Sequence, residues 1–597
     1  MEVTAGLLMD FIEEQASSNA GRPAVIWRTG SISYRELMCR VRSVSAKLQE
    51  RGAVGETPVA VCTDRSVAWI VGALATLHAG AMYVPVDPLY PLKRKLRMFE
   101  DASVRLVLID APPVEPLPDW IETLELDVDS PVTNSACEKG KVVRGQAAYG
   151  IYTSGSTGAP KNVIIPHDAL ANYAAVLRHQ SSLTSADRFL HTASLAFSAS
   201  IRQLITPLVS GAALVIATRD QVRDPASLIQ WMLEAGITVF DTVPSYLESW
   251  IATLTRSGRA WCQQLAGSLR LVLTTGEPLQ ACTAKSLRAA LPDIRIFNLY
   301  GQTETTGSVA LYEVDRTDCQ QIPIGSALAP SQFYVLNERM EPSAEGVLYV
   351  TGPSLARCYQ GQPDITASRF LGDPFSTIPG ARMYHTGDRV RRLENGLFEF
   401  KGRTDTQVKI NGIRVELTEI DAALREHPDV EGAATLLRGV ETEDPRLVAF
   451  LVRVPGGDCS SEELQRFLSN TLPNIMIPGT LIFLDEFPRT ASGKIDRPAL
   501  KTLDISSLLA RSSSTPNTRM EQLVAKCWEE ELKVKGIGPD DDFFALGGDS
   551  LQAIQMIYRL QELLPPQLPL SPLFFQNPVL KGFAAQLSEL FQIEEAQ

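Results

Sequence analysis

The sequence has few cysteines, no excess of positive charge and no long apolar run. Its nine cysteines are scattered over 597 residues without a C-x-x-C pair, a pattern that predicts reduced thiols in a cytoplasmic protein. The formal net charge of −13 argues against a general nucleic-acid binder. The longest apolar stretches, such as residues 69–75, are too short to span a membrane, and no basic segment followed by an apolar one opens the chain. We therefore expect neither a nucleic-acid nor a membrane partner.

The composition is that of an ordinary globular protein. Apolar residues make up 45% and charged residues 21% of the chain, enough to build sizeable cores in about three to four domains. The first roughly 400 residues alternate helical periodicity with short β-rich runs, which predicts an α/β layered sheet. Helices are expected at 10–15 and 34–48, and buried parallel strands at 57–61, 104–109, 213–216, 238–243 and 269–273.

The pattern changes twice beyond that region. From about residue 402 a smaller α+β unit is expected, with strands at 407–410 and 447–452 and a helix at 417–426. Residues 511–517 are polar and rich in breakers, which is typical of a linker. A mostly helical pattern follows this linker.

The most informative stretch is a loop of small residues, hydroxyls and glycines, residues 152–161 (YTSGSTGAPK). Glycines let a backbone approach a ligand closely, and successive N–H and hydroxyl groups can surround an anion. The loop ends in Lys161, which adds a positive charge. The spacing is not that of the P-loop, because no Gly-Lys-Ser/Thr opens a helix. Composition alone leaves a flexible loop as the alternative to a polyphosphate site.

Two acidic residues stand in polar segments after apolar runs. Glu304 lies in 298–306 (NLYGQTETT) and could hold Mg²⁺, which prefers oxygen ligands and substrate phosphates. A helix cap beginning at Thr303 is the alternative. Asp388 lies beside a tight turn in 384–388 (YHTGD) and could accept both hydroxyls of a ribose. Here the alternative is an ordinary Gly-Asp hairpin turn.

Three later motifs suggest movement and modification. Residues 402–409 (GRTDTQVK) stand at the composition change and form either a hinge or a charged surface hairpin. Lys494 stands on a glycine turn, from which a mobile domain could bring its charge to a departing phosphoryl group; a solvated turn lysine is the alternative. Ser550 follows a Gly-Gly-Asp turn where helical spacing begins, so it is either exposed to modification or a simple helix cap.

Together and in this order, these motifs resemble the adenylate-forming superfamily, specifically the adenylation domain of non-ribosomal peptide synthetases joined to a peptidyl carrier domain. Further matching stretches are 33–37 (SYREL), 77–85 (LHAGAMYVP), 352–359 (GPSLARCY) and 472–478 (LPNIMIP), so the resemblance covers nearly the whole chain. It implies a large α/β adenylating core at 1–404, a small α+β C-terminal subdomain at 405–503, a linker at 504–517 and an all-α four-helix carrier domain at 518–597.

The resemblance also assigns a role to each motif. Glu304 would bind Mg²⁺, Asp405 would be the hinge, Lys494 would bridge the substrate carboxylate and the α-phosphate, and Ser550 would carry phosphopantetheine. Arg403 would assist at the ribose, and with Lys494 and Asp405 it would take part in catalysis. ATP would be bound by Thr153, Ser154, Gly155, Ser156, Thr157, Gly158, Lys161, Tyr300, Thr303, Asp388 and Arg403. The implied reaction activates a carboxylic acid as its acyl-AMP and passes the acyl group to the carrier thiol.

The acyl pocket departs from the family pattern. By resemblance it would be lined by Phe197, Ser198, Ala199, Arg202, Thr242, Leu273, Thr275, Leu299, Gly307 and Ser308. Ser198 replaces the family aspartate that pairs with the substrate α-ammonium, and a neutral hydroxyl cannot balance a buried cation. The substrate is therefore expected to be a hydroxy, keto, aryl or β-amino acid, or an amino acid in an unusual pose. Arg202 could pair with an anionic or hydrogen-bond-accepting substrate group, or point outward to a surface partner.

Three further positions differ from the family pattern. The usual residues are glycine where this chain has Asn162, proline where it has Gln302 and glycine where it has Cys358. We expect these changes to tune the site without abolishing it.

Two other functions share part of the pattern. An acyl-CoA ligase shares the first half-reaction but has no need of a carrier serine. A non-catalytic docking relative predicts loss of the ATP-site charges, which are retained. Expected partners are the acid, a phosphopantetheinyl transferase and a downstream synthetase or tailoring enzyme that takes over the one building block; a small MbtH-like activator is left open.

Overall fold

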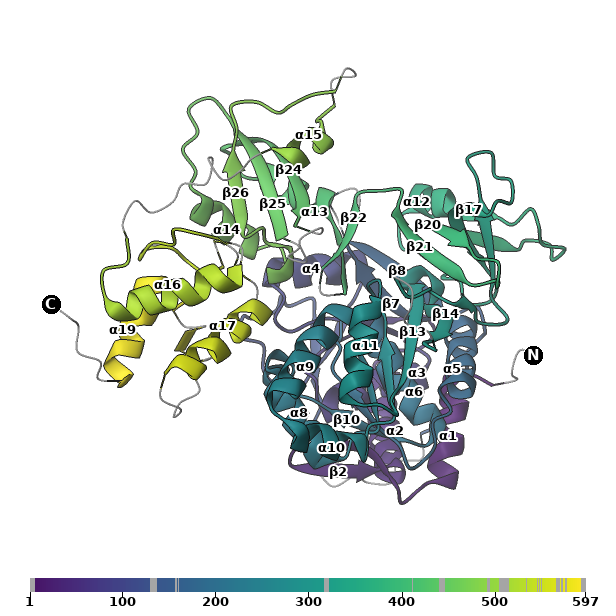
Figure 1. The fold of residues 1–597 in the computed structure, drawn as a ribbon. Helices are drawn as coiled ribbons and strands as arrows, with labels where there is room; N and C mark the ends of the chain where they lie inside the picture. Colours follow the sequence, from purple (N-terminus) through teal and green to yellow (C-terminus); the bar gives the residue numbers. More distant parts are fainter. Residues whose placement is uncertain are drawn as a thin grey trace. The chain divides into compact units, whose positions relative to one another are not determined.

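A computed structural model of the chain describes most of its residues, drawn as a ribbon in Figure 1. The described residues are 6–128, 137–155, 158, 160–315, 321–410, 412–439, 446–490, 494–503, 515–532, 534–544, 546, 548, 550–564, 570, 573–574 and 577–591. They divide into two compact units. One comprises Met1–Gly155 and Ala159–Val415, and the other Ser156–Gly158 and Glu416–Gln597.

The largest sheet of the first unit is mostly parallel and has the strand order β15-β14-β13-β12-β11-β9-β10-β1-β2. Its central strands are short apolar runs buried on both faces, as parallel strands covered by helices require. The bounds are β1 (Pro23–Trp27), β2 (Gly30–Ser33), β9 (Arg188–His191), β10 (Ala213–Ile216), β11 (Val239–Thr242), β12 (Leu271–Thr274), β13 (Arg295–Gln302), β14 (Gly307–Glu313) and β15 (Ser326–Ala327). The strands predicted at 213–216, 238–243 and 269–273 are confirmed as β10, β11 and β12.

A second sheet has the order β18-β8-β7-β4-β3-β5-β6. Its bounds are β3 (Pro58–Cys62), β4 (Met82–Pro85), β5 (Leu106–Ile109), β6 (Glu122–Glu125), β7 (Ala147–Thr153), β8 (Lys161–Pro166) and β18 (Cys358–Tyr359). The predicted strands at 57–61 and 104–109 are confirmed as β3 and β5. Strands β7 and β8 pair antiparallel, so the glycine-rich loop connects two neighbouring strands.

Helices pack against these sheets and against one another. Helix α3 (Val67–Ala79) is buried along its whole length. Helices α8 (Pro225–Ala235), α9 (Pro244–Arg256) and α10 (Arg259–Ala266) pack against one another (Figure 1), and the core of this region includes Trp231 and Trp250. The other helices of this unit are α1 (Leu8–Ser18), α2 (Tyr34–Glu50), α4 (Leu92–Asp101), α5 (His167–Ser181), α6 (Ser198–Ser210), α7 (Arg219–Arg223), α11 (Ala281–Ala290) and α12 (Pro363–Arg369). Helices α1 and α2 confirm the prediction at 10–15 and 34–48.

The first unit also contains a five-stranded sheet, formed by later segments of its sequence. Strands β16 (Gln332–Leu336), β17 (Glu345–Thr351), β20 (Arg382–Arg392) and β19 (Phe370–Gly372) follow one another across it, and β21 (Phe398–Arg403) also pairs with β20. The β22 (Gln407–Ile410) and β23 (Ile413–Glu416) pair comes next, and Val415, the last residue of the unit, lies in β23.

The second unit contains a three-stranded sheet, β24 (Val430–Arg438), β25 (Arg446–Arg453) and β26 (Thr480–Phe483). Its apolar core includes Phe450, Ile482 and Leu500. The helices there are α13 (Leu417–Arg425), α14 (Ser461–Ser469) and α15 (Arg497–Thr502). The predicted helix at 417–426 and the strand at 447–452 are therefore confirmed.

The carrier segment is helical, as predicted. Its described part contains α16 (Arg519–Leu532), α17 (Ser550–Leu563) and α19 (Leu580–Phe591). The aromatic rings of Trp528, Phe543 and Phe574 contact one another edge to face at 5.1–6.1 Å, an arrangement that stabilises a small core. Most of the predicted linker, residues 504–514, lies outside the described residues.

Two expectations about the chain as a whole concern cysteines and membrane spans. Among the described residues, all eight cysteines are free thiols. No helix in the described ranges combines the length and the apolar character needed to cross a bilayer.

Candidate nucleotide site and acyl pocket

The β7–β8 hairpin holds both ends of the glycine-rich loop. Thr153, the last residue of β7, is opposite Lys161, the first residue of β8, and its hydroxyl donates to the Lys161 carbonyl at 3.4 Å. Gly158 has a φ of 85°, in the left-handed region that glycine adopts without strain. Ser156 and Thr157 lie outside the described residues. The antiparallel pairing therefore places Lys161 beside the start of the loop, although eight residues separate them in sequence.

Asp388 is held in place from two sides. It is almost fully buried and follows Gly387, whose φ of 76° forms the turn. One carboxylate oxygen accepts hydrogen bonds from the Tyr300 hydroxyl at 2.5 Å and the Gln302 amide at 2.7 Å. The other pairs with the Arg403 guanidinium, because Asp388 and Arg403 are opposite each other in the β20–β21 ladder. The predicted ribose ligand is thus a fixed, charge-paired carboxylate.

Gln302 has a specific role at the position where the family usually has proline. Its amide nitrogen donates to Asp388 and to the Thr386 carbonyl at 3.1 Å, and its amide oxygen accepts from the Tyr384 hydroxyl at 2.9 Å. Proline can make none of these side-chain bonds. This departure therefore strengthens the support of Asp388.

Arg403 and Asp405 form a second, linked ion pair at the predicted hinge. The Arg403 guanidinium is bidentate on Asp405, with N–O distances of 2.7 and 2.9 Å, and Arg369 reaches the same carboxylate at 3.3 Å. Burial alone would raise the pKa of Asp405, but the hydrogen bonds and charge of Arg403 and the charge of Arg369 lower it. The carboxylate stays ionised, and the segment after β21 is anchored by charge.

Glu304, the predicted Mg²⁺ ligand, is fully buried and anionic. It lies in the 3₁₀ turn Thr303–Thr305, where Tyr359 donates to Oε1 at 2.8 Å. Nη1 of Arg414 lies 2.8 Å from both carboxylate oxygens. Burial would raise the pKa of Glu304, but the charges of Arg414 and Lys161 and hydrogen bonds from Tyr359 and the backbone lower it. The Lys161 ammonium lies 5.5 Å from the centre of the Tyr359 ring.

These groups fit a magnesium nucleotide in charge and chemistry. An ionised carboxylate suits Mg²⁺, and Lys161 beside a glycine-rich loop suits phosphate. In the present geometry Nη1 of Arg414 contacts both oxygens of Glu304, so a metal ion bound to this carboxylate would be repelled by the guanidinium charge. Arg414 was not predicted from the sequence, because residues 413–416 (IRVE) alternate apolar and charged residues as an ordinary strand does.

A hydrogen bond connects the predicted nucleotide site with the predicted acyl pocket, and several acyl-pocket residues lie close together. The Thr303 hydroxyl donates to the Ser198 hydroxyl at 3.4 Å. Leu273 and Leu299 belong to one apolar cluster. A Cβ on Gly307 would lie 2.7 Å from the Tyr173 hydroxyl, so only glycine fits there. Phe197 and Ala199 flank Ser198 at the start of α6, and Thr275 follows β12.

Arg202 does not reach the surface. Its guanidinium makes a bidentate pair with Asp241, at 2.7 and 2.9 Å, and lies 3.4 Å from the Ser308 hydroxyl. The alternative of a surface partner is therefore wrong. Thr242 is next to Asp241 on β11, but strand alternation places Asp241 on the face of Leu273, its partner in the ladder. The sequence analysis assigned Thr242, not Asp241, to the acyl pocket. Neighbouring residues of a strand lie on opposite faces, and the sequence alone did not show which face of β11 is turned toward Leu273.

Lys494 and Ser550 belong to the second unit. Lys494 is exposed, and its carbonyl accepts a hydrogen bond from the Thr490 amide at 2.8 Å. Ser550 is the first residue of α17. In the turn before it, a Cβ on Gly548 would lie 2.2 Å from the Phe543 ring, so glycine lets this turn pack against the carrier core.

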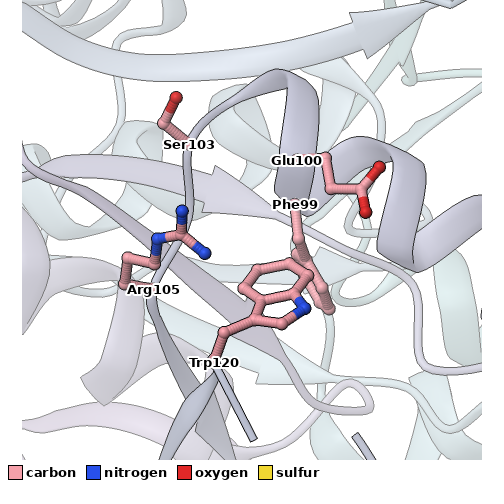
Figure 2. Close-up of a pocket in the computed structure, with 5 residues that line it drawn as sticks. All are labelled: Phe99, Glu100, Ser103, Arg105 and Trp120. Atoms are coloured by element: carbon pink, nitrogen blue, oxygen red, sulfur yellow. The ribbon is translucent and has the colours of Figure 1, made fainter. Parts of the chain in front are cut away.

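A separate hollow lies elsewhere on the first unit. It has a volume of about 280 Å³ and is lined by Phe99, Glu100, Ser103, Arg105 and Trp120 (Figure 2). The Arg105 guanidinium lies 4.8 Å from the Trp120 ring centre. None of these residues belongs to the predicted nucleotide site or acyl pocket.

Comparison with known proteins agrees with this geometry. Residues 12–360 match the AMP-binding enzyme family, residues 419–494 match the AMP-binding enzyme C-terminal domain, and residues 522–587 match the phosphopantetheine attachment site. The dimodular nonribosomal peptide synthase of Bacillus subtilis is 36% identical over 97% of this chain. Tyrocidine synthase 3 of Brevibacillus parabrevis is 34% identical, also over 97% of it. The chain spans only 24% and 9% of the length of these two relatives.

Solved structures show the same architecture. Holo-PA1221, an NRPS protein with adenylation and PCP domains bound to a vinylsulfonamide inhibitor, superposes with a TM-score of 0.83 at 26% identity, over 98% of this chain and 96% of that one. IdnL1 superposes with a TM-score of 0.71 at 29% identity, over 81% of this chain and 99% of that one. The AMP-binding model implies ATP and Mg²⁺, and the attachment-site model implies phosphopantetheine on a serine. The chain therefore belongs to the AMP-binding enzyme family, as an adenylate-forming ligase of the non-ribosomal peptide synthetase type whose adenylation domain is followed by a carrier domain.

Proposed function

We propose that this chain activates a carboxylic acid with ATP and loads the acyl group onto its own carrier serine, Ser550. The observation that carries the proposal is the charge arrangement of the first unit. Asp388 and Glu304, the two predicted nucleotide and metal carboxylates, are both buried, and the glycine-rich loop begins beside Lys161. A docking relative has no need of this set of charged residues, and the chain retains Lys161, Glu304 and Asp388.

In the first step an oxygen of the substrate carboxylate attacks the α-phosphorus of ATP. The bond from that phosphorus to the bridging oxygen breaks, and pyrophosphate leaves with the electron pair. Asp388 would hold the ribose, and Lys161 with the loop would hold the outer phosphates. A bound Mg²⁺ would neutralise phosphate charge, with Glu304 as its ligand. The protein acts here by positioning and by charge stabilisation.

Lys494 would complete the first step by contacting the substrate carboxylate and the α-phosphate. In the second step the acyl group passes from AMP to the carrier thiol: the sulfur attacks the acyl carbon, the thiol proton is lost to solvent, and AMP leaves with the electrons of the broken C–O bond. Rotation about Asp405 would exchange Lys494 for the carrier between the steps. Attachment in one chain raises the local concentration of the thiol.

The substrate is proposed to lack a conventional α-ammonium group, because Ser198 stands where the family has an aspartate. The contact of Ser198 with Thr303 at 3.4 Å supports its position beside the nucleotide residues. Ser198→Asp should improve activity with a common α-amino acid. If pyrophosphate exchange were fastest with such an amino acid in the wild type and Ser198→Asp changed nothing, this part of the proposal would be wrong.

The test of the whole proposal combines two measurements. ATP–pyrophosphate exchange over a broad panel of carboxylic acids reports the first step. Mass spectrometry after treatment with a phosphopantetheinyl transferase, ATP and the best acid reports loading of Ser550, with Ser550→Ala as control. Acyl transfer only to free coenzyme A would instead establish an acyl-CoA ligase, and an absence of both reactions would overturn the proposal. The domain boundaries, a cytoplasmic location, the lack of a membrane partner and the MbtH-like activator stay predictions.

A further inference from the structure

Three side chains of the kinds that bind metals meet in the second unit. A ring nitrogen of His427, the sulfur of Cys459 and a carboxylate oxygen of Asp429 all lie within 4.8 Å of one another. His427 is buried and Cys459 is 1% exposed, whereas Asp429 is half-buried, so the group is not sealed from solvent. None of the three residues belongs to the predicted nucleotide site or acyl pocket.

The fold holds the two segments that carry these residues together. His427 and Asp429 lie between α13 and β24, and Cys459 lies in the loop between β25 and α14. The Val454 amide donates to the Asp429 carbonyl at 3.0 Å, and the Arg453 guanidinium donates to the Cys459 carbonyl at 2.6 Å. Both hydrogen bonds end on main-chain oxygens. They therefore fix the backbone without using the thiol or the carboxylate of the group.

The His427 ring is oriented for coordination through Nδ1. This nitrogen accepts a hydrogen bond from the Asp429 amide at 3.2 Å, and the nitrogen that accepts is the one that carries the lone pair in a neutral imidazole. Nε2 then carries the proton, and it lies 4.0 Å from the Glu463 carboxylate. A carboxylate beside the far nitrogen is the usual orienting partner of a metal-bound histidine. A metal at Nδ1 has to replace only the amide hydrogen bond, which is at the long end of the normal range.

The donor set selects the kind of metal. A thiolate, an imidazole and a carboxylate are the ligands of zinc sites, whereas Mg²⁺ and Ca²⁺ prefer oxygen ligands alone. Zinc bonds of about 2.0–2.3 Å in a tetrahedron place ligand atoms about 3.4–3.6 Å apart. Separations of up to 4.8 Å reach that range by small side-chain rotations. The two negative charges of a thiolate and a carboxylate also balance the charge of Zn²⁺.

We infer that His427, Asp429 and Cys459 form a zinc site, with a water molecule as the fourth ligand. Binding deprotonates the Cys459 thiol, and the proton goes to solvent as the sulfur–zinc bond forms. The ion joins the loop before α14 to the turn before β24, so it stabilises the second unit. This inference does not depend on the proposed function, because the site shares no residue with the adenylating machinery.

The test is metal binding by the full chain in the absence of nucleotide. Equilibrium dialysis with Zn²⁺ gives the affinity, and Co²⁺ in place of Zn²⁺ gives a charge-transfer absorption band only if sulfur is a ligand. Cys459→Ala should lose this band and bind Zn²⁺ at least about tenfold more weakly, since even partners of metal ligands contribute about tenfold to a hundredfold. Cys527→Ala is the matched control, because Cys527 is also buried but lies on α16 outside the group, and it should bind as the wild type does.

Thermal unfolding distinguishes a built site from casual binding to a thiol. Zn²⁺ should raise the unfolding temperature of the wild type and of Cys527→Ala, but not that of Cys459→Ala. Equal Zn²⁺ affinities for the wild type and Cys459→Ala, or a Co²⁺ spectrum of the wild type without the sulfur band, would overturn the inference. If Cys459→Ala does not fold, Asp429→Asn decides: a loss of at least about tenfold in Zn²⁺ affinity supports the site, and an unchanged affinity overturns it.

Discussion

Replacing Arg414 by alanine tests whether Glu304 is a metal ligand. According to this hypothesis, Arg414 forms an ion pair with Glu304 as long as no metal is bound. Glu304 is 0% exposed and Arg414 is 14% exposed, and they lie 2.8 Å apart. Removing one partner of a buried ion pair costs about 3–5 kcal/mol, because the other charge is left without compensation. Arg414→Ala should therefore lower the unfolding temperature of the first unit when neither metal nor nucleotide is present.

The same substitution should strengthen metal binding. In the wild type the Arg414 guanidinium contacts both oxygens of Glu304 and repels a metal cation bound there, and in the variant this guanidinium is gone. If only about 1.4 kcal/mol of the pair's free energy opposes binding, the variant binds the metal about tenfold more tightly. A ligand present at 100 times its Kd stabilises the folded state by about 2.7 kcal/mol, so saturating metal should recover much of the lost stability.

The assay is a titration with Mn²⁺ and a non-hydrolysable ATP analogue, in which electron paramagnetic resonance measures the free metal. Arg270→Ala is the matched control, because Arg270 pairs with Asp187 at 2.7 Å, away from Glu304. That control should lose stability without any change in the Mn²⁺ Kd. Equal Mn²⁺ affinities for the wild type and Arg414→Ala, with no added stabilisation of the variant by metal, would refute the reasoning.

Further changes address the other parts of the site. Asp388→Asn should raise the KM for ATP by about tenfold to a hundredfold, since hydrogen bonds to a charged group contribute about 1.5–3 kcal/mol; an unchanged KM would exclude it as a ribose ligand. Lys494→Ala should abolish most pyrophosphate exchange, whereas Ser550→Ala should leave exchange unchanged and prevent loading, as mass spectrometry would show; the opposite pattern would reverse their roles. Burial and the charge of Arg65 lower the pKa of His191 from 6.5 to about 3, so the unfolded chain takes up the proton first and stability falls as pH drops from about 6.5 toward 3. The loss is about 1.4 kcal/mol per pH unit, and His191→Phe should reduce it in urea unfolding at pH 7 and pH 5; an equal loss in the variant would count against His191.

The sequence predicted those parts of the fold whose signal is local. Short apolar runs such as those in residues 213–216 and 269–273 became buried strands, because three or four consecutive apolar residues already indicate a buried parallel strand. The helix at 34–50 carries its own start signal, a capping box between Ser33 and Glu36. The glycine-rich loop and Asp388 could likewise be found from motifs in which a turn and its functional residue are adjacent.

The sequence could not reveal partners that meet only in the folded chain. Arg414 contacts Glu304 across 110 residues, and Asp241 contacts Arg202 across 39. Both contacts depend on which face of a strand a residue occupies, and a shift of one residue in a strand reverses that face. The hydrogen bonds of Gln302 to Asp388 and Tyr384 also join segments that are distant in the sequence. The sequence therefore indicated only that Gln302 tunes the site, and not which residues it contacts.

Two buried ion pairs of the first unit, Arg202–Asp241 and Arg414–Glu304, differ in what can separate them. Arg202 and Asp241 lie on α6 and β11, and α6 packs against β9, the neighbour of β11 in the large sheet, so these elements cannot part without unfolding the core. Arg414 lies on the short β22–β23 pair, which follows the predicted hinge Asp405 and forms only a two-stranded sheet. The fixed pair holds α6 and β11 in one relative orientation. If the chain rotates about Asp405 as proposed, the pair on this hairpin would release Glu304 to a metal ion in one of the two proposed half-reactions and take it back in the other.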